Sequence, residues 1–299
     1  MGKIAFVFSG QGDQFPGMGK EFDEKYPAAL SVYEMCDRLR PGTSDQCFGG
    51  TEEELKETRN TQPCLFAFEL AAAMVLHERG VRPHAAAGFS LGEVVAATYS
   101  GIFSHETGFQ LVCRRGELMQ REAEKHDTSM AAVVKLEAGK VQEICGRFPE
   151  VYPVNYNAPG QIAVSGLSSQ MAGFSAAVKE AGGRAIPLKV KGAFHSPFME
   201  AAAKAFANEL EAAEKKKAEL TLYSNMTAQP YTDDVVGLLS EQICSPVQWE
   251  KIICNMAREG VDTFIEVGPG KTLTNMIKRI SPQAAAYTVA EYLAEVEAC

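Results

Sequence analysis

The chain has 299 residues, of which 46% are hydrophobic and 22% are charged, and its formal net charge at pH 7 is -9. This length and apolar content exclude a disordered chain, and the negative charge argues against a nucleic-acid partner, which needs concentrated Lys and Arg. The eight cysteines form no C-x-x-C pair and no cluster with His, so we expect reduced thiols and neither a zinc site nor a disulfide framework.

The chain begins with an apolar run, KIAFVFSG at residues 3–10, that is typical of a parallel strand buried on both faces. The loop after it, GQGDQFPGMG at 10–19, is rich in Gly but has Phe15 where a dinucleotide-binding G-x-G-x-x-G motif needs Gly. We favour a loop whose backbone N–H groups face a ligand oxygen, with a purely structural turn as the alternative.

The longest apolar stretch is PCLFAFELAAAMVLHERG, residues 63–80, which is bounded by Pro63 and Gly80 and interrupted by Glu69. It is too short and too polar to span a bilayer, and it predicts a buried helix. The N-terminal segment MGKIAFVFSGQG lacks the long apolar region of a signal peptide. We therefore expect a cytoplasmic protein without a membrane partner.

The stretch AAGFSLGE, residues 86–93, places Ser90 between Gly88 and Gly92 at the start of a helical pattern. A nucleophilic serine on a sharp strand-to-helix turn needs glycines at these two positions, where a side chain would collide with the tightened backbone. The next N–H, at a helix start, can then stabilise an oxyanion. The alternative is a helix N-cap, with Glu93 completing a capping box. This stretch alone leaves both interpretations open.

The segment CRRGELMQ, residues 113–120, lies in an amphipathic helical pattern. Helical spacing places Arg114 on the polar face and Arg115 among the apolar residues. An arginine that points inward needs an anion. That anion is either a structural carboxylate of the protein or the carboxylate of a substrate, bound through two hydrogen bonds.

From Met130 the pattern changes to strand, helix, strand, strand, helix, strand, at 130–136, 138–148, 151–157, 161–166, 168–183 and 184–190. This βαββαβ order is the ferredoxin-like arrangement of a small subdomain. We predict that residues 127–190 form it as an insertion, and that 1–126 and 191–299 form the large domain. A cleft between two such bodies is a natural ligand site.

The segment KGAFHSPFM, residues 191–199, carries His195 just after this subdomain. A lone His is more often structural, but its place downstream of a candidate nucleophile favours a general base. Further strands are predicted at HAAAGF, TLYSN and DTFIEVG, residues 84–89, 221–225 and 262–268. Alternating strands and helices predict an α/β fold with a mainly parallel, α/β-hydrolase-like large domain, whose functional residues lie at strand ends.

Two other segments have simpler interpretations. EVGPGKTLTNMIKRI, residues 266–280, imitates the end of a P-loop but has Ile265 where the earlier Gly is required, which argues against ATP binding. The run from Lys215 to Lys217 lies in a helical pattern rich in Ala and Glu and predicts a solvated helix face.

Eight segments, in order along nearly the whole chain, resemble the malonyl-CoA:acyl carrier protein transacylase family. They are GQGDQ, NTQPCL, GFSLGE, RRGELMQ, NYNAPGQIAVSG, GAFHSPFM, PVQW and EVGPGKTLTNMIKRI. The resemblance implies that Ser90 carries the malonyl ester, that His195 is the general base, and that Arg115 holds the malonyl carboxylate. It also implies an oxyanion hole formed by the backbone N–H groups of Gln11 and Leu91.

By the same resemblance, the backbone carbonyl of Gln242 orients His195 in place of a triad carboxylate. The Phe194–His195 pair is similar to the form associated with malonyl rather than methylmalonyl selection. One departure is Phe89, which stands where the family usually has His and leaves the detail of the pocket open.

The implied function is transfer of a malonyl group from malonyl-CoA to the phosphopantetheine thiol of acyl carrier protein, by a ping-pong route that supplies fatty acid biosynthesis. We expect a monomer that needs no metal, nucleotide or other cofactor. The alternatives are a discrete polyketide-synthase acyltransferase, which would share every motif, and a serine thioesterase or acyl hydrolase. A patatin-like lipase would need a D-G-[AG] motif, which this chain lacks, and a non-catalytic carrier-binding module would have lost Ser90, His195 or Arg115.

Docking of the carrier protein depends on the charges of both proteins. Carrier proteins of this pathway are typically acidic, and this chain is acidic too, so long-range repulsion opposes their encounter unless basic residues gather near the cleft. The candidates that flank the site motifs are Lys189, Lys191, Lys271, Lys278 and Arg279. The alternative is that these residues are scattered and solvated.

Overall fold

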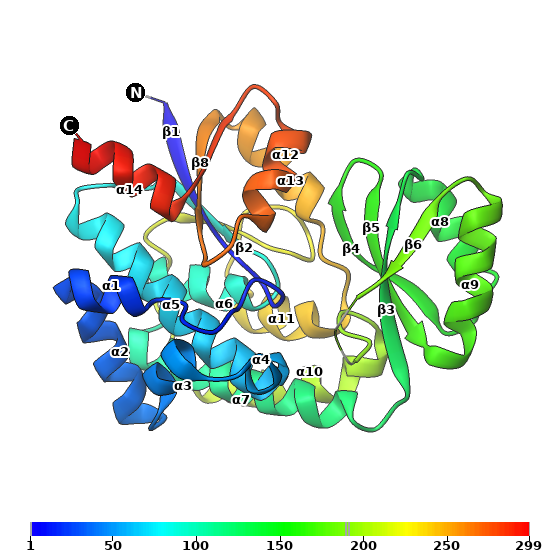
Figure 1. Cartoon of the computed structure of the whole chain (residues 1–299), viewed down its shortest axis with the longest axis horizontal. Coiled ribbons are helices and arrows are strands. Elements are labelled where there is room, and N and C mark those ends of the chain that lie inside the picture. The colour runs from blue at the N-terminus through cyan, green and yellow to red at the C-terminus, as the bar shows by residue number, and fades with distance from the viewer. Residues whose placement is uncertain (1, 189, 191, 299) are drawn as a thin grey trace.

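The computed structural model describes residues 2–188, 190 and 192–298, and it contains two β-sheets with helices around them (Figure 1). The larger sheet is parallel throughout, in the order β7-β2-β1-β8-β9. Its strands are β1 (Lys3–Phe8), β2 (Ala85–Gly88), β7 (Thr221–Tyr223), β8 (Val261–Val267) and β9 (Ala285–Thr288). The predicted α/β fold with a mainly parallel sheet is confirmed, and β9 is a strand that the sequence analysis missed.

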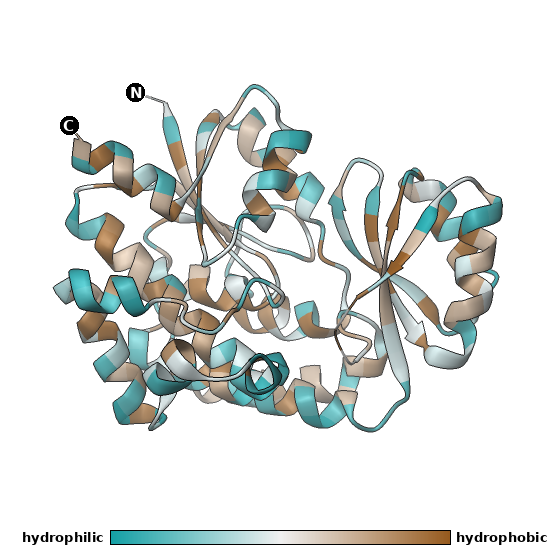
Figure 2. Cartoon of the chain, in the orientation of Figure 1, coloured by the Kyte–Doolittle hydropathy of each residue, from teal (hydrophilic) through white to brown (hydrophobic). Residues whose placement is uncertain are grey.

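Both faces of this sheet are buried, which explains its continuous apolar strands. The helices of this part are α1 (Lys20–Lys25), α2 (Pro27–Leu39), α3 (Thr43–Gly49), α4 (Glu52–Lys56), α5 (Thr58–Glu78), α6 (Leu91–Tyr99), α7 (His105–Ala123), α10 (Glu200–Ala212), α11 (Val235–Glu241), α12 (Trp249–Arg258), α13 (Thr272–Ile280) and α14 (Val289–Ala298), with 3-10 turns η1 (Pro197–Met199) and η2 (Gln242–Cys244). In β1, Phe6 and Phe8 face the core formed with α2, α5, α6 and α7, whereas Ala5 and Val7 face the core formed with α12 and α13. Many helices carry hydrophobic residues along one side and hydrophilic residues along the other (Figure 2).

The second sheet is antiparallel and lies at one end of the molecule, on the right of Figure 1. Its strand order is β4-β5-β3-β6, formed by β3 (Thr128–Val134), β4 (Val151–Ala158), β5 (Gln161–Leu167) and β6 (Arg184–Pro187), with α8 (Ala138–Cys145) and α9 (Ser168–Glu180) packed on it. This is the predicted βαββαβ arrangement. The division of the chain at 127 and 190 stays a prediction, and Lys189 and Lys191 lie outside the described residues.

The two sheets are joined by a segment that follows η2. Val247 donates its N–H to the carbonyl of Val154 in β4 (2.8 Å) and accepts from the N–H of Tyr156 (2.9 Å). Arg279 of α13 donates to the carbonyl of Pro159, in the turn between β4 and β5 (2.7 Å). Val247, five residues after Gln242, and helix α13 are therefore both bonded to the antiparallel part of the molecule.

Helix α5 begins earlier than predicted. It starts at Thr58 and includes Pro63, which the sequence analysis placed at its boundary. Pro63 removes one hydrogen bond from the helix, but a tertiary contact supports the early start, because the N–H of Thr58 donates to the side chain of Gln120 (2.8 Å). No helix among the described residues is long and apolar enough to cross a membrane.

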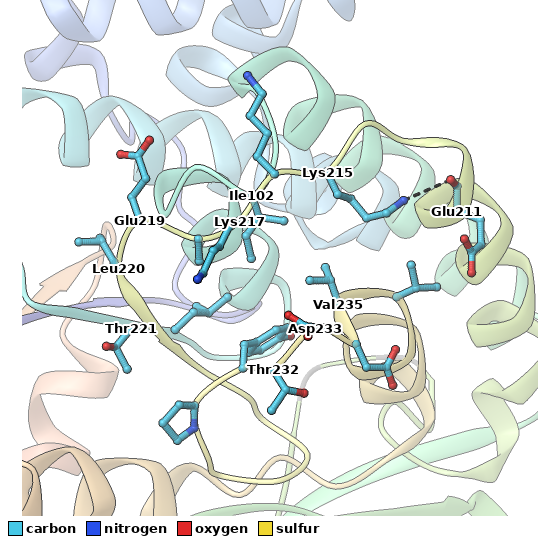
Figure 3. A pocket seen from close by; sticks show the side chains of 17 residues that line it. Ile102, Glu211, Lys215, Lys217, Glu219, Leu220, Thr221, Thr232, Asp233 and Val235 are labelled. Atoms are coloured by element: carbon cyan, nitrogen blue, oxygen red, sulfur yellow. Dashed lines mark hydrogen bonds between the residues drawn. The ribbon is translucent and has the colours of Figure 1, made fainter.

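The lysine run 215–217 is not helical, since α10 ends at Ala212. Lys215 turns back and donates to the carbonyls of Leu210 (2.6 Å) and Glu211 (3.2 Å), two of the last carbonyls of the helix. Figure 3 marks the second of these hydrogen bonds. A cation at a helix C-terminus satisfies carbonyls that have no partner within the helix. The predicted helical face is therefore wrong, although Lys216 and Lys217 are exposed.

Candidate active site

Ser90 lies on a strained turn between β2 and α6, with φ 56° and ψ -110°. Gly88 and Gly92 make this turn possible. A Cβ atom on Gly88 would lie 1.9 Å from the carbonyl carbon of Gly92, and one on Gly92 would lie 2.4 Å from the carbonyl oxygen of Phe8. The packing of β1, β2 and α6 thus requires both glycines, as the sequence predicted.

The side chain of Ser90 does not cap the helix. Although Ser90 occupies the N-cap position of α6, its Oγ makes no capping hydrogen bond and instead lies 2.8 Å from Nε2 of His195. Glu93 points into the core, where three other groups donate to its carboxylate. The capping-box interpretation is therefore wrong, because both side chains have partners elsewhere.

The hydrogen bonds of His195 define its tautomer. Its Nδ1 lies 2.8 Å from the backbone carbonyl of Gln242, which can only accept, so Nδ1 carries the hydrogen. Nε2 then presents its lone pair to the hydroxyl of Ser90. The ring is buried, with 3% of its residue surface exposed. This arrangement can accept the Ser90 proton as Oγ attacks an electrophile.

The environment keeps His195 neutral. Burial, followed by the positive charge of Arg115, lowers the pKa of His195 to about 4, and hydrogen bonds with the backbone of Gln242 and Ser245 oppose the shift. The free base is therefore the dominant form across the neutral pH range.

Arg115 projects inward from α7, as the helical spacing predicted. Its residue is fully buried, whereas Arg114 pairs with Glu117 and with Glu209 (3.0 Å) at the surface. Burial lowers the pKa of Arg115 to about 10, and attraction to Glu93 opposes the shift. Arg115 therefore stays protonated at neutral pH.

Amide oxygens hold the Arg115 guanidinium. Nη1 donates to Oε1 of Gln62 (2.8 Å) and Nη2 to Oε1 of Gln242 (2.7 Å), and Nη2 also lies 3.4 Å from Oγ of Ser90. Within the described residues Arg115 forms no ion pair, and its buried Nε has no hydrogen-bond partner. The structural carboxylate proposed as an alternative is not found there, so the cation can bind a substrate anion beside Ser90.

Two backbone N–H groups near Ser90 are available to a ligand. Leu91 is the first residue of α6, and Gln11 lies in the loop after β1, whose last residue pairs with Gly88. Neither N–H has an acceptor among the residues that the structure describes. The side chain of Gln11 donates to Oγ1 of Thr58 (3.3 Å), which anchors the loop.

Asn225 is a site residue that the sequence analysis did not assign. Its Oδ1 accepts from the N–H of Ser90 (2.8 Å), and its Nδ2 donates to the carbonyl of Gly88 (2.5 Å). Both polar ends of one side chain thus hold the strained turn. Its position at the end of the predicted strand TLYSN could have identified it as a site residue, because the strand ends of a parallel sheet gather at one edge.

Phe89 and Phe194 contribute apolar surface beside the polar groups. The ring of Phe89 packs edge-on against Trp249, with 5.5 Å between centroids, and a Cβ on Gly10 would come within 2.8 Å of it. Phe194 is buried in the main core. Gly192 allows its position, since a Cβ there would lie 3.0 Å from Cζ of Phe194.

The P-loop-like segment has no free helix start for a phosphate. The carboxylate of Glu266 accepts from the N–H groups of Leu273 (2.9 Å) and Thr274 (2.7 Å), which are the groups a phosphate would use. Glu266 therefore occupies the position that a phosphate of ATP would need. The described residues also contain no cluster of His, Cys, Asp or Glu that could hold a metal ion, and their cysteines are free.

A buried Ser–His pair on a strand-to-helix turn, at the carboxyl edge of a parallel sheet, is typical of enzymes that transfer or hydrolyse acyl groups. A family model described as "Acyl transferase domain" matches residues 5–296, and this chain belongs to that family of acyltransferases. The family predicted from the eight sequence segments is thereby confirmed.

Individual relatives agree. The chain is 38% identical over 299 residues to the malonyl CoA-acyl carrier protein transacylase of Bacillus subtilis (strain 168), covering 97% of this chain and 94% of the relative. The crystal structure of the enzyme of that name from Clostridium perfringens has a TM-score of 0.94 at 33% identity, over 99% and 98% of the two chains. A malonyl-transacylase in complex with its type II PKS acyl-carrier protein has a TM-score of 0.95 at 30% identity, over 99% and 100%.

The low pKa of His195 predicts the acid limit of Ser90 reactivity. Protonated His195 cannot accept the Ser90 proton, so the rate falls as the pH drops through the folded-state pKa of about 4. Inactivation by an uncharged sulfonyl fluoride should be nearly constant from about pH 8 to about pH 5.5, and should decline about tenfold per unit below about pH 4. Circular dichroism at each pH checks that the protein stays folded, and a midpoint near the ordinary His value would contradict the assigned environment.

Proposed function

We propose that this chain transfers a malonyl group from malonyl-CoA to the phosphopantetheine thiol of an acyl carrier protein through a malonyl ester on Ser90. The observation that carries the proposal is the buried Arg115 guanidinium, which lies 3.4 Å from Ser90 Oγ and is not paired directly with any carboxylate in the described part of the chain. A carboxylate-bearing acyl group supplies a direct anionic partner. The names of the relatives support the same donor and acceptor.

The first half-reaction acylates the enzyme. Nε2 of His195 takes the hydroxyl proton of Ser90 while Oγ attacks the thioester carbon. The N–H groups of Gln11 and Leu91 stabilise the oxyanion of the tetrahedral intermediate. When the carbon–sulfur bond breaks, His195 returns the proton to the leaving CoA thiolate.

The second half-reaction repeats these steps in reverse. His195 accepts the proton of the carrier thiol, the sulfur attacks the ester carbon, and Ser90 recovers its hydrogen as the new thioester forms. One thioester is exchanged for another, so the reaction is nearly balanced in energy and proceeds without a metal, nucleotide or other cofactor. In this mechanism the carbonyl of Gln242 orients His195, and Phe194 borders the acyl group.

The same chemistry would serve either a fatty acid or a polyketide carrier. One relative was solved in complex with a type II PKS acyl-carrier protein. Both a fatty acid carrier and a polyketide carrier are therefore candidate partners. We propose that the protein acts as a monomer, since Ser90, His195 and Arg115 all come from one chain. We also propose that it is cytoplasmic. A hydrolase is disfavoured, because the relatives are named as transacylases.

Mass spectrometry of the intact protein tests the acyl-enzyme. Incubation with malonyl-CoA should add one malonyl group, which a digest should place on Ser90 because the hydroxyl is hydrogen-bonded to its base. Ser90→Ala should remain unlabelled, and His195→Ala should acylate about 10²- to 10⁴-fold more slowly. Labelling of a cysteine, or undiminished labelling of Ser90→Ala, would sink the proposal.

The kcat/KM for malonyl and acetyl transfer tests the role of Arg115. Acetyl-CoA leaves the buried guanidinium without an anion, so the wild type should use it about 10²- to 10³-fold less well. Arg115→Ala should lower malonyl transfer by about 10²-fold or more while acetyl transfer holds or rises. Arg114→Ala is the matched control, because that side chain pairs with carboxylates at the surface. An equal loss for both substrates in folded Arg115→Ala would show that the residue is structural.

Carrier docking can be tested at the candidate basic residues that lie within the described structure. Lys271, just before α13, and Lys278, on α13, are exposed, whereas Arg279 is bonded to the β4–β5 turn, so the first two are the better candidates. Reversing both charges should raise the KM for carrier about three- to tenfold and leave carrier-free hydrolysis of malonyl-CoA unchanged. Lys179→Glu, exposed on the distant α9, is the control. Equal damage to both reactions would assign the lysines to the CoA site or to folding.

A further inference from the structure

Glu93 is a fully buried carboxylate that receives hydrogen bonds only from neutral groups in the described structure. Its Oε1 accepts from the N–H of Asn225 (3.0 Å) and the hydroxyl of Tyr231 (2.7 Å), and its Oε2 accepts from Nε2 of Gln242 (2.8 Å). All three partners donate, so the arrangement fits the ionised carboxylate, which can only accept. Burial raises the pKa of Glu93 to about 7, and the hydrogen bonds and Arg115 oppose the shift.

The carboxylate of Glu93 and the carbonyl of Ser90 together determine which way the Gln242 side chain points. Because Oε2 of Glu93 can only accept, the NH₂ end of Gln242 faces it, and the same Nε2 also donates to the carbonyl of Ser90 (2.6 Å). The oxygen end of Gln242 is thereby turned to Nη2 of Arg115. An inverted amide would place two donors against each other at Arg115.

Gln242 also keeps the two buried charges apart. Glu93 attracts Arg115 and stabilises its cation, yet the amide of Gln242 lies between them and no direct ion pair forms. A direct pair would occupy the guanidinium and compete with a substrate carboxylate. The arrangement compensates the charge of Arg115 while leaving its surface beside Ser90 available.

We propose that Glu93 is a positioning residue for acyl selectivity, acting through the Gln242 amide to hold Arg115 ready for a carboxylate-bearing acyl group. The inference rests on the proposed malonyl transfer. It assigns Glu93 no contact with the substrate and no part in moving protons. Gln242 then has two distinct roles: its backbone carbonyl accepts from His195, and its side-chain oxygen accepts from Arg115.

The variant Glu93→Gln tests this assignment. The backbone N–H of Asn225 is a fixed donor, so the new amide should keep its oxygen there and present its NH₂ group to Gln242. Gln242 then either keeps its NH₂ group on the Ser90 carbonyl, against the new NH₂ group, or turns and places its oxygen against that carbonyl and its NH₂ group against Arg115, so its contact with Arg115 is disturbed in both cases. At about pH 8, where wild-type Glu93 is ionised, kcat/KM for malonyl-CoA should fall about 10- to 100-fold, with less than about a threefold change for acetyl-CoA.

Tyr231→Phe is the matched control. Tyr231 lines a cavity of about 870 Å³ together with Lys217, Asp233 and Val235, which are labelled in Figure 3. The variant removes one hydrogen bond from Glu93 but leaves a carboxylate that still accepts from Gln242. Its malonyl-to-acetyl ratio should therefore match that of the wild type, even if its stability falls.

Gln242→Met gives a second route to the answer if Glu93→Gln does not fold. It keeps the backbone carbonyl that bonds His195 and removes the amide between Glu93 and Arg115, so it should also lose malonyl preference selectively. Equal losses for both substrates in the folded variant, with wild-type preference intact, would overturn the inference. A wild type that shows no malonyl preference would instead overturn the proposed function itself.

Discussion

The site is organised around a guanidinium that is buried without a carboxylate partner in the described structure. Removing a cation from water costs several kcal/mol, and an adjacent Asp or Glu is the usual compensation. Here Arg115 is held by the side-chain oxygens of Gln62 and Gln242, while the nearest compensating charge, Glu93, acts through Gln242. The protein forgoes the stronger direct pair, and an anion-binding position beside Ser90 results.

The backbone around Ser90 is equally constrained. The ends of β1 and β2 pair in register, and the absence of side chains on Gly88 and Gly92 lets α6 start in direct contact with both strands. Asn225, from the end of β7, holds the turn by bonding the N–H of Ser90 and the carbonyl of Gly88. Because sheet and helix fix this turn, the Oγ of Ser90 can face His195 despite an unfavourable φ.

Periodicity and spacing predicted much of this arrangement, but only within single segments. Helical spacing turned Arg115 inward and Arg114 outward, and the glycine pattern identified the Ser90 turn; both are confirmed. The partners of Arg115 come from residues 53 and 127 positions away, and no local pattern states which residues meet across such distances.

The errors have the same origin. The capping box at Ser90 and the late start of α5 were reasonable local expectations. Two tertiary hydrogen bonds overrode them: the N–H of Asn225 donates to Glu93, and the N–H of Thr58 donates to the side chain of Gln120. Strand β9, at Ala285–Thr288, is short and lacks the long apolar run that marks a central strand. Its pairing with β8 is what makes it a strand.

The same cation connects selectivity with proton transfer. The charge of Arg115 is one of the causes that lower the pKa of His195, which keeps the base neutral in the free enzyme. A carboxylate bound to Arg115 offsets that charge, so the basicity of His195 rises when a carboxylated acyl group is in place. An acetyl group brings no such charge and leaves His195 the weaker base. In the mechanism that we propose, Arg115 therefore favours the carboxylated substrate twice, once through binding and once through the strength of the base that activates Ser90.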